Sequence, residues 1–139
     1  MGHEVGELVI AILEETTMRT AGRVMSGLAV AFLLFDSAIK LVTHASVVEA
    51  FPQIGYPLST AVAIGAIELA CLVLYVVPRT AVLGAILLTG YLGGAIASHV
   101  RIGSPLLTHT LFPIYVAALI WGGLFVRETR LRELVPLRG

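Results

Sequence analysis

Four long apolar runs divide this chain, and the third of them is the most clearly defined. Between Arg79 and His99 no residue is charged, and at 1.5 Å per residue these roughly 20 positions reach about 30 Å, the thickness of a bilayer's hydrocarbon core. Small residues recur in this run in two neighbouring rows, Ala81, Ala85, Thr89, Gly93 and Ala97 in one and Gly90 and Gly94 in the other. Such rows let helix backbones approach closely in lipid. The pattern predicts a transmembrane helix with neighbours packed against its small faces.

The same reasoning places four membrane spans along the chain. Their approximate bounds are residues 24–42, 58–77, 80–99 and 106–126. The segment from His44 to Pro57 is predicted to be a loop, because Pro52 and Pro57 break helices. The predicted fold class is therefore all-α, a bundle of four transmembrane helices in residues 23–126.

Two polar segments flank the predicted bundle. Residues 1–22 carry four glutamates, and their apolar residues fall at helical spacing, which indicates either a helix at the interface or against a partner, or a disordered tail. Residues 127–139 contain four arginines against two glutamates and form a basic tail.

Composition agrees with a membrane protein. Of 139 residues, 58% are hydrophobic and 13% are charged, against about 25% charged in ordinary soluble domains. A water-soluble domain has no room to bury so much apolar surface. The nine basic and nine acidic residues balance, so nothing attracts nucleic acid, and none is expected as a partner.

The arginines predict the orientation of the bundle. With four spans both termini share one side, and that side also holds the turn between spans two and three. Seven arginines fall there and only Arg101 falls on the other: Arg19, Arg23, Arg79, Arg127, Arg130, Arg132 and Arg138. Positive charge concentrates on the cytoplasmic side of membrane proteins, so both termini are expected in the cytoplasm.

Three ionisable residues lie inside the predicted spans. Asp36 and Lys40 are spaced i, i+4 in span one, and Glu68 is near the middle of span two. Each such residue costs roughly 2.5–3.5 kcal/mol at the bilayer centre, so they are expected to face one another. The topology adds other side chains, and together they predict a polar pocket in the outer half of the bundle. The additional members are Tyr91, Ser98, His99, Arg101, His109 and Cys71.

Glu68 is the strongest candidate for chemistry in this pocket. Its own helix has no basic residue within one turn, and a desolvated carboxyl without a partner is expected to hold a proton, as a general acid must. Tyr91 and His99 are the other candidate catalytic residues, although a tyrosine there can equally be packing and a histidine interfacial. Asp36 and Lys40 also fit a purely structural ion pair.

Cysteine and histidine usage argues against several site types. A single cysteine, Cys71, allows no disulfide and no dithiol relay within one chain, and its position near the face of Glu68 fits packing best. Four scattered histidines predict no metal site. No haem, flavin or iron–sulfur signature is present in the sequence, so we expect no bound cofactor, with quinone left open as a ligand.

Several short motifs resemble one known family. They are Lys40-Leu41, Gly55-Tyr56-Pro57, Ile64-Gly65, Glu68-Leu69, Pro78-Arg79-Thr80, Leu83-Gly84-Ala85, Thr89 to Ala95, His99-Val100-Arg101, His109, Leu111-Phe112-Pro113, Tyr115 and Trp121-Gly122-Gly123. As a set they resemble the DoxX-like family of small four-helix membrane proteins over residues 23–135. Ser37 departs from the pattern, where glycine is expected after the aspartate. Residues 1–22 match nothing in it.

The resemblance implies a compact bundle in a bacterial plasma membrane. Several relatives are linked to redox systems, including thiosulfate oxidation with quinone as acceptor, and others resemble assembly factors or lipophile-binding proteins. Three functions therefore stay open. The bundle binds, and acts by acid–base or redox-linked chemistry on, a lipophile of the quinone or isoprenoid class. It is a non-catalytic membrane subunit or assembly factor of a redox complex, its expected partner being a member of that complex or a second copy of the chain in a homo-oligomer. Or it moves protons or a small solute.

Overall fold

The computed structural model describes residues 1–134, and every regular element within them is helical. The elements are α1 (Gly2–Leu41), α2 (Ala45–Gln53), η1 (Leu58–Thr60), α3 (Ala61–Val76), α4 (Ala81–Arg101), η2 (Leu106–Thr110), α5 (Phe112–Arg127) and α6 (Thr129–Leu134). Four helical stretches are long and apolar enough to cross a membrane: α1, η1 with α3, α4, and η2 with α5. The predicted all-α bundle of four spans is confirmed.

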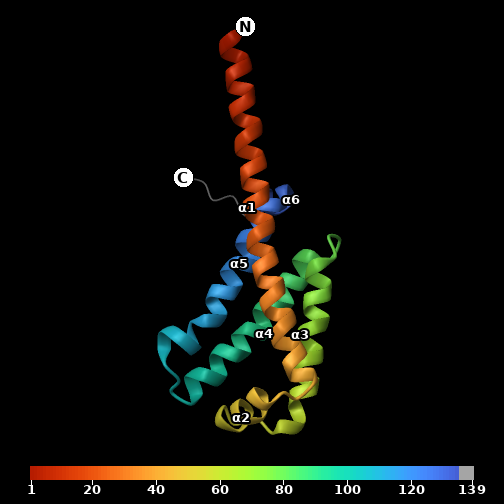
Figure 1. The fold of residues 1–139 in the computed structure, drawn as a ribbon, viewed down its shortest axis with the longest axis vertical. Coiled ribbons are helices and arrows are strands. Elements are labelled where there is room, and N and C mark those ends of the chain that lie inside the picture. The colour runs from red at the N-terminus through yellow and green to blue at the C-terminus, as the bar shows by residue number, and fades with distance from the viewer. Residues whose placement is uncertain (135–139) are drawn as a thin grey trace.

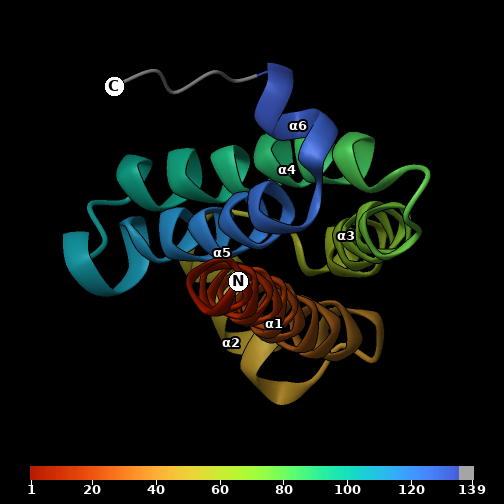
Figure 2. The same cartoon turned by 90° about the horizontal axis from the view of Figure 1, so that it is seen from above.

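The four long helices pack in a ring. Helix α1 lies against α3 and α5, and α4 lies against the same two helices from the other side (Figure 2). Helix α2 crosses one end of the bundle, below the point where α1 ends and α3 begins (Figure 1). The N-terminus and α6 lie toward the opposite end. We call these ends the α2 end and the terminal end.

Two glycines allow the tightest helix contacts. A Cβ at Gly84 of α4 would overlap the backbone of Tyr75 in α3, and a Cβ at Gly123 of α5 would overlap Ser26 of α1. Both lie where neighbouring helices touch. Close approach of this kind is what small residues provide in helical membrane proteins, because lipid supplies no hydrophobic drive between helices.

The row of small residues in α4 is buried only in part, so the prediction that neighbouring helices pack against it holds for that part alone. Ala81 and Ala85 are buried, but Thr89, Gly93 and Ala97 are exposed. Added Cβ atoms at the second row, Gly90 and Gly94, would meet open space. Small residues permit close approach but do not enforce it, and toward the α2 end α4 borders a cavity.

Helix α1 continues far beyond the bundle. Its 40 residues correspond to about 60 Å, twice the thickness of a hydrocarbon core. Residues 1–21 are all exposed, and Gly22 is the first buried residue. The segment 1–22 is thus one helix with the first span and projects from the terminal end (Figure 1). Its expected place at an interface or against a partner stays a prediction.

The predicted loop between spans one and two contains a helix, which corrects that prediction. Helix α2 begins after His44, whose side chain accepts a hydrogen bond from the backbone N–H of Ser46. Val47 and Phe51, one turn apart, are both buried. This apolar pair anchors the segment to the bundle. Pro52, which has no backbone N–H to donate, lies one residue before this helix ends.

The basic tail is described only in part. Arg127 ends α5, and the short helix α6 follows with Leu131 buried. Residues 135–139, and with them Arg138, lie outside the described part of the chain.

Candidate functional site

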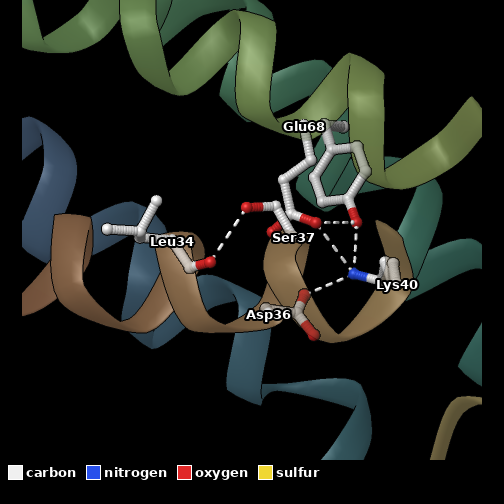
Figure 3. A network of polar contacts seen from close by, with 6 residues as sticks. Leu34, Asp36, Ser37, Lys40 and Glu68 are labelled. Carbon is white, nitrogen blue, oxygen red and sulfur yellow. Dashed lines mark hydrogen bonds and ion pairs between the residues drawn. The ribbon is translucent and has the colours of Figure 1, made fainter. Parts of the chain in front are cut away.

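The charged residues of the spans meet at one point inside the bundle. Lys40 Nζ donates hydrogen bonds to Asp36 Oδ2 one turn earlier in α1, to Glu68 Oε2 of α3 at 2.9 Å, and to the Tyr91 hydroxyl of α4 at 2.7 Å. Figure 3 shows the carboxyl groups of Asp36 and Glu68 directed toward the Lys40 ammonium. We call these four residues the charged cluster.

Glu68 is the most deeply buried member of the charged cluster. Its side chain is fully buried, whereas that of Lys40 is 12% exposed and that of Asp36 is 29% exposed. Glu68 Oε2 also accepts a hydrogen bond from the Tyr91 hydroxyl at 2.9 Å. Its second oxygen, Oε1, has no hydrogen-bond partner among residues 1–134. Two carboxylates face one ammonium, so a single added proton would make the cluster neutral.

Glu68 has a cation as its partner, although its own helix offers none within one turn. The partner is Lys40, 28 residues earlier in α1; the sequence leads us to expect these residues to face one another, but also to treat Glu68 as a carboxyl without a partner. Helices α1 and α3 cross closely at this point, since a Cβ added at Gly65 of α3 would lie 2.8 Å from Lys40 Cβ. This close crossing brings Lys40 to Glu68. Glu68 is therefore ion-paired, and its chemistry belongs to the cluster as a whole.

A cavity of about 570 Å³ lies beside the charged cluster toward the α2 end. Asp36, Lys40 and Tyr91 line it, and Gly90 and Gly94 form part of its α4 wall. The remaining walls are mostly apolar and come from α1, α2, α3, η2 and α5: Phe32, Leu33, Ile39, Val47, Ala50, Phe51, Ile54, Ile64, Phe112, Pro113 and Val116 are among them. The cavity thus combines an apolar body with a charged patch.

The other predicted pocket residues on α4 and η2 line the same cavity. Ser98 is hydrogen-bonded to Tyr56 at 3.2 Å. The rings of His99 and His109 lie 5.7 Å apart between centroids. Their Nδ1 atoms are hydrogen-bonded to hydroxyls of residues close in sequence, that of His99 to Ser104 and that of His109 to Thr108. These histidines form a second polar patch, about two turns of α4 beyond Tyr91.

Two predicted pocket residues lie elsewhere. Cys71 is buried in the apolar core formed by the four long helices. Arg101 donates a hydrogen bond to the backbone oxygen of Ile54 at 2.6 Å, and its guanidinium lies over the ring of Tyr56. Arg101 therefore fastens the segment after α2 to the end of α4.

Sequence reasoning also missed residues that line the cavity. Phe32 and Phe112, whose rings meet edge to face at 5.0 Å, join α1 to α5 at its wall. Tyr56 and the residues of α2 cover its end. The i, i+4 pair Val47 and Phe51 was a usable signal for α2, but no pattern in the sequence marks the two phenylalanines as neighbours.

Metal ligation finds no support in this arrangement. Within residues 1–134, no group of three or more histidine, cysteine, aspartate or glutamate side chains is placed to hold a metal ion. The polar groups of the cavity are instead an ammonium, carboxylates, hydroxyls and imidazoles. Such groups hold and orient the polar end of an organic ligand by hydrogen bonds.

Fold and site together define a small multi-pass membrane protein, a four-helix bundle with a charged cluster inside it. The sequence model of the DoxX-like family matches residues 24–123, and the chain belongs to this family. No curated protein and no solved structure matches this chain.

Proposed function

We propose that this protein binds a small lipophile in the cavity, with its polar end beside the charged cluster. The observation that carries this proposal is a cavity of about 570 Å³ whose mostly apolar wall includes Asp36, Lys40 and Tyr91. Ligand sites are usually apolar cavities of about 300–1,000 Å³ with a few convergent polar groups. The ligand classes that we propose are quinones and isoprenoids, which join an apolar body to a polar end.

Burial of the cluster suits it to hold a polar head group. In a low-dielectric surrounding, hydrogen bonds and charge interactions are stronger than in water. Lys40 and Asp36 border the cavity, while Glu68 stands behind them and fixes the Lys40 ammonium. The cluster is thereby held in one geometry before a ligand arrives, which reduces the entropy cost of binding.

Mass spectrometry of small molecules extracted from the purified protein tests the proposal. The variant Gly94→Leu places a side chain in the cavity, since an added Cβ there meets open space. Gly93→Leu is the matched control: it is the same exchange in open space, about 100° around α4 and outside the arc that borders the cavity. We expect a defined lipophile in wild type and Gly93→Leu, at least roughly tenfold depleted in Gly94→Leu. Equal amounts in all three proteins, or bulk lipid only, contradict the proposal.

A second candidate function is docking of a redox complex, and the projecting part of α1 favours it. Residues 1–21 are exposed and carry four glutamates together with apolar side chains. At the terminal end, α6 adds basic residues. A non-catalytic membrane subunit would use these acidic and basic segments to hold a partner enzyme. In pull-downs, deletion of residues 2–20 would then release the partner, whereas Gly94→Leu would retain it.

We also propose that the protein resides in a bacterial plasma membrane, with both of its termini in the cytoplasm. Arg19, Arg23, Arg79, Arg127, Arg130 and Arg132 belong to segments at the terminal end, and Arg101 belongs to the α2 end. Positive charge marks the cytoplasmic side. Fluorescent-protein and alkaline-phosphatase fusions at Gly139 measure this orientation, and an active phosphatase fusion overturns it.

A further inference from the structure

The hydrogen-bond donors of the charged cluster are already engaged. An ammonium group has three N–H donors, and those of Lys40 point to Asp36, Glu68 and Tyr91. Because the Tyr91 oxygen accepts from Lys40, the phenol uses its own hydrogen to donate to Glu68 Oε2. Neither cavity-lining donor of the cluster has a hydrogen left for a ligand.

Three hydroxyl groups nearer the α2 end, those of Tyr56, Ser98 and Ser46, are engaged in the same way. Ser98 donates to the backbone oxygen of Gly94 at 2.9 Å, so the Tyr56 hydroxyl is the donor in its 3.2 Å hydrogen bond to Ser98. Ser46 repeats the pattern. His44 Nδ1 accepts from the Ser46 backbone N–H, so the ring nitrogen is an acceptor and the Ser46 hydroxyl donates to it at 3.0 Å.

Acceptors, in contrast, are left over. Asp36 uses Oδ2 for Lys40, and its other oxygen, Oδ1, accepts no hydrogen bond from residues 1–134. Asp36 lines the cavity, and its side chain is partly exposed. The charges of the cluster also favour a ligand that donates hydrogen bonds, because the two carboxylates of Asp36 and Glu68 outnumber the single ammonium of Lys40. His99 and His109 can serve as either donor or acceptor, depending on tautomer.

We propose that the cavity takes a lipophile whose polar head donates a hydrogen bond, a hydroxyl or a protonated amine, with Asp36 Oδ1 as the acceptor. This inference rests on the proposed function and narrows its ligand class. Beside the charged cluster, a head with acceptors only, such as a carbonyl or carboxylate, must displace an existing hydrogen bond and leave a buried group unpaired. Among quinone-class ligands, the site therefore favours the hydroquinone, with its two hydroxyls, over the oxidised quinone.

Four probes with one apolar body and different heads test this inference. They are 2-naphthol, 2-naphthylmethylammonium, 2-acetylnaphthalene and 2-naphthoate, each titrated by calorimetry into the full-length protein in detergent micelles. Binding lost in Gly94→Leu but kept in Gly93→Leu is counted as cavity binding, which removes simple partition into the micelle. We expect the naphthol, the ammonium probe or both to bind at least roughly tenfold tighter than the other two.

The variant Asp36→Asn adds a second readout. It keeps the side-chain shape but replaces one carboxylate oxygen with an N–H₂ donor, so we expect the preference for donor heads to disappear or reverse. The wild-type ranking stands as a test even if this variant does not fold. Cavity binding with equal affinities, or with a preference for acetylnaphthalene or naphthoate, overturns the inference and leaves the proposed function intact. No cavity binding by any probe overturns the proposed function as well.

Discussion

Replacing Lys40 with methionine removes the only cation from the charged cluster. Methionine keeps the length and the helix propensity of lysine but leaves Asp36 and Glu68 without the ammonium that both contact. Because Glu68 is fully buried, it has no solvent to replace that partner. The variant therefore measures the cost of leaving these carboxylates without a cation.

The size of the loss has a ceiling, because the unpaired carboxylate can take up a proton. A glutamic acid in water titrates at about pH 4.3, so holding it protonated at pH 7 costs roughly 3.7 kcal/mol. Breaking buried ion pairs by removing one partner typically costs about 3–5 kcal/mol. We expect Lys40→Met to lower the free energy of unfolding by about 3–4 kcal/mol at pH 7.

The pH dependence follows from the same mechanism. In the variant, the folded state binds a proton at pH 7 that the unfolded state does not, so stability rises as pH falls. The variant's own free energy of unfolding should therefore rise by up to about 1.4 kcal/mol per pH unit as pH falls from 7 toward about 5. Below the ordinary titration range of a carboxyl, both states are protonated and the penalty is gone.

Unfolding in mixed detergent micelles, followed by circular dichroism at 222 nm, measures this prediction. Glu68→Gln is the control, because it removes one negative charge and leaves Lys40 paired with Asp36, and we expect it to cost about 1 kcal/mol or less. The double variant should recover at least about 2 kcal/mol of the loss. The reasoning is refuted if the free energy of unfolding of Lys40→Met lies within about 0.5 kcal/mol of the wild-type value. It is also refuted if that free energy changes neither with pH nor with the second substitution.

Two further changes test the packing. Gly84→Ala should lower the free energy of unfolding by about 1–3 kcal/mol, because its Cβ overlaps the Tyr75 backbone. Gly90→Ala, in open space on the same helix, should be neutral or up to about 1 kcal/mol stabilising. Equal effects of the two substitutions would show that the α3–α4 contact is not tight. Deleting residues 2–20 should change the bundle's stability by less than about 0.5 kcal/mol, since no residue before Gly22 is buried, and a larger loss in the same assay would mean that this segment packs on the bundle.

The sequence by itself determined the number of spans and the membrane as the surroundings. A helix must satisfy its backbone hydrogen bonds internally in lipid, so four apolar runs of about 20 residues leave few alternatives to a helical bundle. The cost of burying charge also determined that Asp36, Lys40 and Glu68 are exceptional positions. These are properties of single segments, and a linear pattern carries them.

Tertiary structure decided which residues meet. The partner of Glu68 is on another helix, and the α1–α3 crossing that brings Lys40 to it depends on packing along both helices. Gly90 and Gly94 have the spacing of a helix interface, yet they border a cavity because α4 packs on α3 and α5 while α2 crosses the end of the bundle. Contacts between distant segments reflect the shapes of all neighbours at once, and no periodicity within one segment encodes them.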